Sequence, residues 1–185
     1  MVDLTKLGPL APLVGTWEGA EGLDVSFSHA KGGAVETPFR ERASFAPLGP
    51  VKNGSQELYG LDYRTEAIRI GEDEPFHTEV GYWLWDAADG EVMRCFLVPR
   101  GSALIAGCVT EPDALQFTMR AGLGANDYGI LSNRYLDRVA KAVKFEVELD
   151  LRDGRYAYQE DTQLEFQGRG EVFHHTDRNV LTKVA

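Results

Sequence analysis

The chain has 185 residues, of which 43% are apolar and 26% are charged, and this size and balance predict one globular domain spanning residues 1–185. Its 19 basic and 29 acidic side chains give a formal charge of −10, so nucleic acids and anionic membrane surfaces are not expected as partners. No run of about 18 unbroken apolar residues is present, and the apolar stretch 7–14 is a poor signal peptide because Pro9 and Pro12 interrupt it, so a cytoplasmic location is expected.

Residues 5–13 are predicted to form a short helical turn that caps one end of the fold. Downstream of it, apolar residues recur mainly with a period of two, which is the period of a β-strand. Turn-forming residues, above all Gly, Pro, Asn and Asp, separate the alternating segments. The predicted strands are residues 15–19, 23–28, 38–46, 56–70, 76–86, 91–99, 103–110, 114–120, 143–152, 156–166 and 172–183.

The clearest hairpin lies in the C-terminal third of the chain. Residues 143–152 alternate apolar and charged side chains, and Asp153-Gly154 then predicts a two-residue type I′ turn. This turn pairs Leu149 with Tyr158 and points Glu160 into the interior, unless a bulge moves that acid outwards. Just before the hairpin, one short helix is predicted near residues 133–141, since apolar residues recur there every fourth position.

About ten strands joined by short loops predict an all-β fold, either a sandwich or a barrel. We favour a closed antiparallel up-and-down β-barrel of the calycin or lipocalin type, with one or two short helical turns, because closure removes the exposed strand edges. A barrel of this width is expected to enclose a cavity for a small-molecule ligand rather than a solid core.

Several catalytic motifs are missing from the sequence, among them the P-loop, GxSxG and HExxH. His77-Thr78-Glu79 matches the HxE of zinc deaminases, but the PCxxC that completes such a site is absent. Cys95 and Cys108 are the only cysteines, and we expect both to be buried, reduced thiols.

Two histidine-containing segments are candidates for a site, whereas His29 is expected to be solvated on a loop. His174 and His175 are neighbours in the last predicted strand, so only one of them can face the interior. Glycines at 168 and 170 prevent the alternation from being carried over from the preceding strand, and the sequence leaves open which histidine that is.

The aromatic segment 76–85 holds the other candidate, His77. Its even-numbered residues are expected on the core face: Phe76, Val80, Tyr82 and Leu84. His77 and Glu79 would then lie side by side on the opposite face. Periodicity favours an ordinary surface His–Glu pair near a barrel rim, and the alternative is a polar group at the mouth of a pocket.

Three motifs, in this order along the chain, resemble the nitrobindin family of haem-binding β-barrels. Gly15-Thr16-Trp17-Glu18-Gly19 resembles the opening GxWxGxG, and Pro75-Phe76-His77-Thr78-Glu79-Val80-Gly81-Tyr82 resembles the P-x-H-x-E-x-G-Y strand. His175, followed by Leu181, Lys183 and Val184, resembles the closing strand. Glu21 stands where the last glycine of the first motif is expected, and the Tyr-Pro-Thr that follows in the family is absent, which is typical of a divergent branch.

The resemblance implies a ten-stranded barrel with haem b at its open end, ferric iron bound by His175, and a sixth position open to nitric oxide or water. It implies that His77 and Phe76 line the distal side, that Trp17 closes the other barrel end, and that the activity is isomerisation of peroxynitrite to nitrate. The alternative function is a non-enzymatic carrier of an apolar small molecule such as a fatty acid. The sequence does not give the oligomeric state, and a homodimer is one of the assemblies it leaves open.

Overall fold

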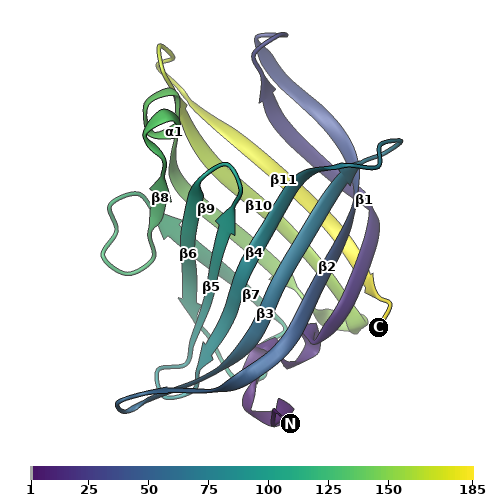
Figure 1. Ribbon diagram of the computed structural model, residues 1–185, viewed down its shortest axis with the longest axis vertical. Helices are drawn as coiled ribbons and strands as arrows, with labels where there is room; N and C mark the ends of the chain where they lie inside the picture. The colour runs from purple at the N-terminus through teal and green to yellow at the C-terminus, as the bar shows by residue number, and fades with distance from the viewer. Residues whose placement is uncertain (1) are drawn as a thin grey trace.

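The computed structural model describes residues 2–185 and confirms the predicted closed antiparallel barrel (Figure 1). Ten strands pair in the order β5-β4-β3-β2-β1-β11-β10-β9-β7-β6, and pairing of β5 with β6 closes the ring. A further short strand, β8, extends the sheet beside β6. The strands are β1 (Gly15–Ser28), β2 (Gly33–Asn53), β3 (Gln56–Arg69), β4 (Pro75–Asp86), β5 (Glu91–Val98), β6 (Ser102–Val109), β7 (Gln116–Gly122), β8 (Ile130–Ser132), β9 (Ala140–Asp150), β10 (Arg155–Phe166) and β11 (Val172–Lys183).

Helical structure is confined to short segments: η1 (Leu4–Lys6), η2 (Gly8–Leu13), α1 (Arg134–Val139) and η3 (Arg152–Gly154). The predicted helix near 133–141 is α1, which begins after Asn133, whose side chain accepts hydrogen bonds from the amides of Tyr135 and Leu136. Among residues 2–185, no helix is long and apolar enough to cross a membrane.

Three strands differ from the prediction. The two segments predicted at 15–19 and 23–28 are one strand, β1, with a bulge between Gly19 and Gly22. The segment between the strands predicted at 38–46 and 56–70 was expected to be a turn, but most of it continues β2, whose pairing with β3 passes a bulge and runs to Asn53. β8 was not predicted, because a strand of three residues is too short to show a period.

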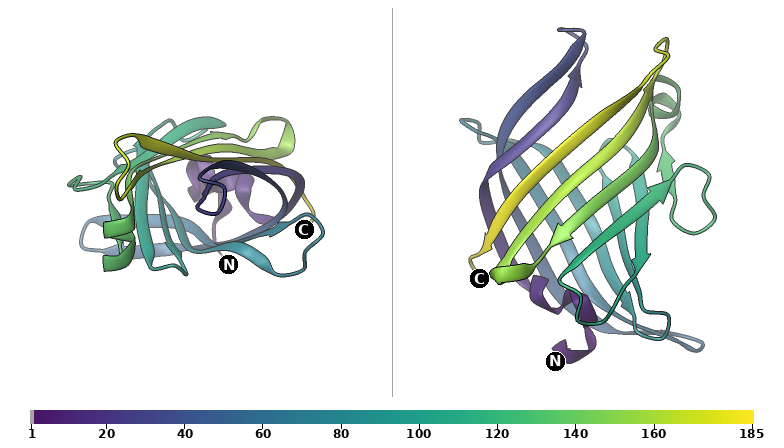
Figure 2. Two further views of the ribbon diagram at one scale, coloured as in Figure 1. Left: turned by 90° about the horizontal axis from the view of Figure 1, so that it is seen from above. Right: turned by 180° about the vertical axis from the view of Figure 1, so that it is seen from behind.

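The 3-10 helices η1 and η2 close one end of the barrel, as predicted for residues 5–13 (Figure 2). Leu10 and Leu13 are fully buried there. Trp17 is also buried, and its indole Nε1 donates a hydrogen bond to the Leu13 carbonyl oxygen at 2.7 Å. We call this the closed end, and the opposite end, where β4 and β11 begin, the outer end.

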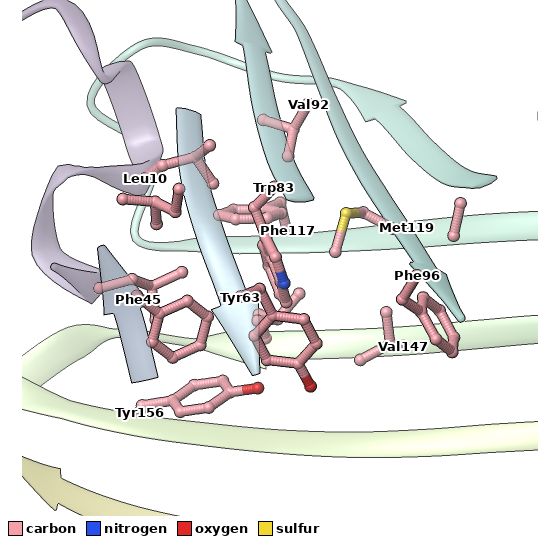
Figure 3. Close-up of a cluster of buried hydrophobic side chains, with 14 of the residues drawn as sticks. Leu10, Phe45, Tyr63, Trp83, Val92, Phe96, Phe117, Met119, Val147 and Tyr156 are labelled. Atoms are coloured by element: carbon pink, nitrogen blue, oxygen red, sulfur yellow. The ribbon is translucent and has the colours of Figure 1, made fainter. Parts of the chain in front are cut away.

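Buried apolar side chains fill the half of the barrel next to η2, so the predicted ligand cavity does not extend into this half (Figure 3). Aromatic rings fill it, because Trp17, Phe45, Tyr63, Trp83 and Tyr156 all point inward and pack edge to face or stacked. Large aromatic side chains thus fill the interior space that a barrel of ten strands would otherwise leave empty.

The hairpin of β9 and β10 has the predicted register, with Leu149 opposite Tyr158. Asp153 and Gly154 both have positive φ, 57° and 69°, as a type I′ turn requires. The loop is longer than the predicted two residues, however, because β9 ends at Asp150, β10 begins at Arg155 and the 3-10 turn η3 lies between them. This register fixes which residues of β10 face inward, and Glu160 is one of them.

Candidate functional site

The inward face of β4 is the face opposite to the one predicted. Glu79 and Trp83 are buried, whereas Val80 and Tyr82 are 41% and 51% exposed. The prediction of a core face at Phe76, Val80, Tyr82 and Leu84 is therefore wrong, and so is the preferred interpretation of His77 and Glu79 as a surface pair. Apolar residues lie on both faces of this strand, so hydrophobic periodicity could not distinguish the core face from the outer face.

Directly above the aromatic core lies a layer of buried charged groups, here named the ion-pair layer: Glu41, Glu79, Arg94 and Glu160. Arg94 on β5 is only 2% exposed. Its Nη2 donates to Glu79 Oε2 at 2.6 Å, and its Nη1 donates to Glu160 Oε1. The guanidinium therefore joins β4 to β10 across the barrel interior. Glu160 points inward without a bulge. The positive charge of Arg94 compensates the negative charge of the Glu160 carboxylate in the interior.

Arg94 and burial together determine the protonation of the two acids that it binds. Burial opposes ionisation of Glu79, but the charges of Arg94 and His77 and their hydrogen bonds lower its pKa to about 2. Burial raises the pKa of Glu160 despite its contact with Arg94. Arg94 thus contacts both carboxylates, but the ionised form is favoured more strongly for Glu79 than for Glu160.

Glu41 on β2 completes the layer without any cation. It accepts hydrogen bonds from Thr65, Tyr158 and Asn179, at 2.8 to 3.0 Å. Burial nevertheless raises the pKa of Glu41 above its ordinary value. Three neutral donors compensate only part of the cost of removing a carboxylate from water.

Towards the outer end lies a second group, here named the histidine layer: Asp24, His77, His175 and Asp177. His77 Nε2 is 3.1 Å from Glu79 Oε1, and the imidazole side chain is 39% exposed. Burial opposes protonation of His77, but the hydrogen bond and the charge of Glu79 outweigh it and raise the pKa of the ring. His77 is therefore oriented by a carboxylate that Arg94 holds in place.

His175, not His174, faces the interior of the barrel. Its Nε2 is 2.6 Å from Asp24 Oδ1 on the adjacent strand β1, and its side chain is 35% exposed. His174 points outward, where its Nδ1 pairs with Asp161 Oδ2 at 2.8 Å on the outer face. The structure thus gives the orientation that the sequence left open.

Two groups of aromatic side chains lie on the strands that carry the histidine layer or on their neighbours. In the first group Phe27, Phe166 and Phe173 pack together with ring centroids 4.8 to 5.9 Å apart. In the second group Phe76 packs against Phe39 at 5.9 Å. His29 is in an exposed turn, as predicted, although its ring lies edge-on to Phe27.

An arginine stacks on each of these aromatic groups. The guanidinium of Arg169 lies 4.3 Å from the ring centroid of Phe27, and that of Arg69 lies 4.7 Å from the ring centroid of Phe76. Phe76 is half-buried beside a bulge in the pairing of β3 with β4, which explains how it reaches Phe39 although its neighbour His77 faces inward.

Sequence reasoning missed four of the acidic and basic residues of these layers: Asp24, Glu41, Arg94 and Asp177. A signal was present for Arg94, which has Val92 and Phe96 two residues before and after it and must share their buried face. Asp24 and Asp177 carried no such signal, because alternation of polar residues near a strand end is also typical of a solvated face.

The comparisons with known proteins agree with this architecture. No curated protein sequence matches the chain at a significant level. The crystal structure of Rv2717c from M. tuberculosis is similar in fold, with a TM-score of 0.66, 18% sequence identity and 95% of each chain covered. Residues 6–183 match the family described as "THAP4-like, heme-binding beta-barrel domain". The chain therefore belongs to the family of THAP4-like, haem-binding β-barrel domains.

Proposed function

We propose that this chain binds haem b at the outer end of the barrel, with His175 as the axial ligand, and that it isomerises peroxynitrite to nitrate. One observation carries the proposal: the imidazole of His175 faces inward and remains reachable from solvent, in the strand where the family resemblance implies the iron ligand. Nitric oxide would bind at the sixth position of the same iron.

The residues around His175 fit a haem group. The two aromatic groups, Phe27 with Phe166 and Phe173 and Phe39 with Phe76, include rings within three residues of Asp24, His77 and His175 and offer apolar surface. Arg69 and Arg169 stack on rings of these groups and would pair with the haem carboxylates. Asp24 contacts Nε2 of His175, so this hydrogen bond would have to break for that nitrogen to hold the iron.

When bound, the haem would supply the iron on which the oxygen–oxygen chemistry takes place. The protein's own contribution would be to bind the group, to exclude water and to orient His77. Because Glu79 raises the pKa of His77, a larger share of this ring is protonated near neutral pH than for an ordinary histidine. A protonated imidazole beside the ligand would stabilise an anion such as peroxynitrite.

Titration of the purified protein with haemin, followed by absorption spectroscopy, tests this function. The parent should develop a Soret band that shifts when nitric oxide is added. His175→Ala should lose stable haem binding, whereas the matched control His174→Ala should behave like the parent because His174 faces outward. His77→Ala should retain haem but bind nitric oxide differently and slow the decay of peroxynitrite.

Two results would refute the assignment. If His175→Ala binds haem like the parent, His175 is not the axial ligand. If the parent ignores haemin but protects a fluorescent fatty acid from water, the chain is instead an apolar carrier.

A cytoplasmic location and a homodimer stay predictions, which cell fractionation and light scattering can test.

A further inference from the structure

We propose that Asp24, His175 and Asp177 form a site for a divalent transition-metal ion, of the zinc, manganese or ferrous iron class, in the haem-free chain. This inference goes beyond the proposed haem function and shares only His175 with it. The three residues each present one donor atom, and these atoms lie within 4.8 Å of one another.

The β-sheet register brings these three side chains together. Asp24 on β1 and Asp177 on β11 are directly opposite each other in the ladder. His175 lies two residues before Asp177 on the same face. Zinc binds histidine nitrogen and carboxylate oxygen at roughly 2.0–2.2 Å, which places tetrahedral donor atoms about 3.4 Å apart. Small side-chain rotations would therefore suffice to bring the three donor atoms to this spacing.

The charge balance of the interior favours a cation at this place. Arg94 is occupied by Glu79 and Glu160, and His77 is occupied by Glu79. The carboxylate of Asp177 makes no hydrogen bond or ion pair with any residue among 2–185. Asp177 is thus an inward-facing acid without a partner, next to a second acid and an imidazole.

The donor set and its accessibility indicate the kind of ion. One imidazole and two carboxylates suit zinc, manganese or ferrous iron, whereas calcium and magnesium prefer oxygen donors alone. Asp24 is buried, but the ring of His175 is partly exposed, so an ion can reach the site from the outer end. Three protein ligands leave at least one coordination position for water, as in catalytic rather than structural sites.

Titration of the haem-free, chelator-treated chain with Co²⁺ tests the site, because Co²⁺ in a nitrogen and oxygen site gives visible absorption bands. We expect one ion per chain and displacement of Co²⁺ by Zn²⁺. Asp177→Asn and Asp24→Asn should each weaken Co²⁺ binding about tenfold or more. Asp161→Asn, which changes the His–Asp pair between β10 and β11 on the outer face of the barrel, is the matched control and should leave binding unchanged.

The readouts separate this inference from the haem proposal. Asp177→Asn should still develop the haemin Soret band, since Asp177 is not assigned to haem, and Zn²⁺ should slow haemin uptake by the parent. Absence of Co²⁺ binding by the parent would overturn the metal site and leave the haem proposal standing. Equal binding by Asp177→Asn, Asp24→Asn and the parent would also overturn it. Binding of Co²⁺ without any Soret band would refute the haem function alone.

Discussion

Replacement of Arg94 by methionine is the sharpest test of the interior described here. Arg94 is buried, and its guanidinium is the cation that both Glu79 and Glu160 contact. Methionine keeps much of the side-chain volume and can pack against the ring of Phe96, whose centroid is 4.6 Å from the guanidinium carbon. The substitution therefore removes mainly the charge and its hydrogen bonds.

The expected cost follows from the two acids that Arg94→Met leaves behind. Removing one partner of a buried ion pair typically costs about 3–5 kcal/mol, because the other charge remains buried without compensation. Domains of this size are stable by about 5–15 kcal/mol, so the variant should lose about a fifth or more of its free energy of unfolding. With a urea dependence near 3 kcal/mol/M, this is a midpoint shift of about 1 to 1.7 M.

Equilibrium unfolding in urea measures the effect, and two further variants identify its cause. Arg120→Met removes an arginine from a surface pair with Glu146 and should cost less than about 1 kcal/mol. The triple variant Arg94→Met/Glu79→Gln/Glu160→Gln should recover at least half of the loss, since neutral side chains no longer bury a charge. If Arg94→Met unfolds like the parent, or if the triple variant is no more stable than Arg94→Met, the reasoning fails.

Three further substitutions test other parts of the structure. Gly154→Val should lower the Tm by an amount equivalent to about 1–2 kcal/mol, because φ is 69° at this position and a β-branched residue resists positive φ. Gly154→Asn should be nearly neutral, and equal Tm values for the two variants would contradict the type I′ turn. Leu10→Ala in η2 should cost about 2–5 kcal/mol in urea unfolding, and a loss under about 1 kcal/mol would mean that η2 does not close the barrel. Because burial raises the pKa of Glu41, the folded parent holds this proton more tightly than the unfolded chain and loses stability as pH rises through the folded pKa. Glu41→Gln carries no such proton, so its stability relative to the parent should increase as pH rises from the unfolded-state pKa through the raised folded pKa. The increase should be about 1.4 kcal/mol for each tenfold difference in proton affinity, and a pH-independent difference would contradict this.

The barrel itself could be predicted because its determinants are local. Period-two alternation gives the strands, and Asp153-Gly154 gives one hairpin register that the structure confirms. The closed end could also be anticipated, since the proline-interrupted apolar segment 7–14 can neither continue as a strand nor form a long helix. These features depend on residues that are close together in the chain.

The pairing of the interior charges could not be predicted, because the partners are far apart in the sequence. Glu160 and Arg94 are 66 residues apart, and Asp24 and His175 are 151 residues apart. Without the partner, a buried acid and a solvated acid in an alternating strand give the same pattern. The inward direction of β4 failed for a related reason, since exposed Val80 and Tyr82 resemble a core face.

The ion-pair layer connects the two histidines of the candidate site. His77 contacts Glu79, Glu79 contacts Arg94, and Arg94 contacts Glu160 on β10. Glu160 is the ladder partner of Asp177, which lies two residues after His175 on the same face of β11. Loss of Arg94 should therefore disturb His77 through Glu79 while leaving His175 in its strand register. A folded Arg94→Met variant that retains haem but binds nitric oxide as His77→Ala does would separate the positioning of His77 from the binding of iron.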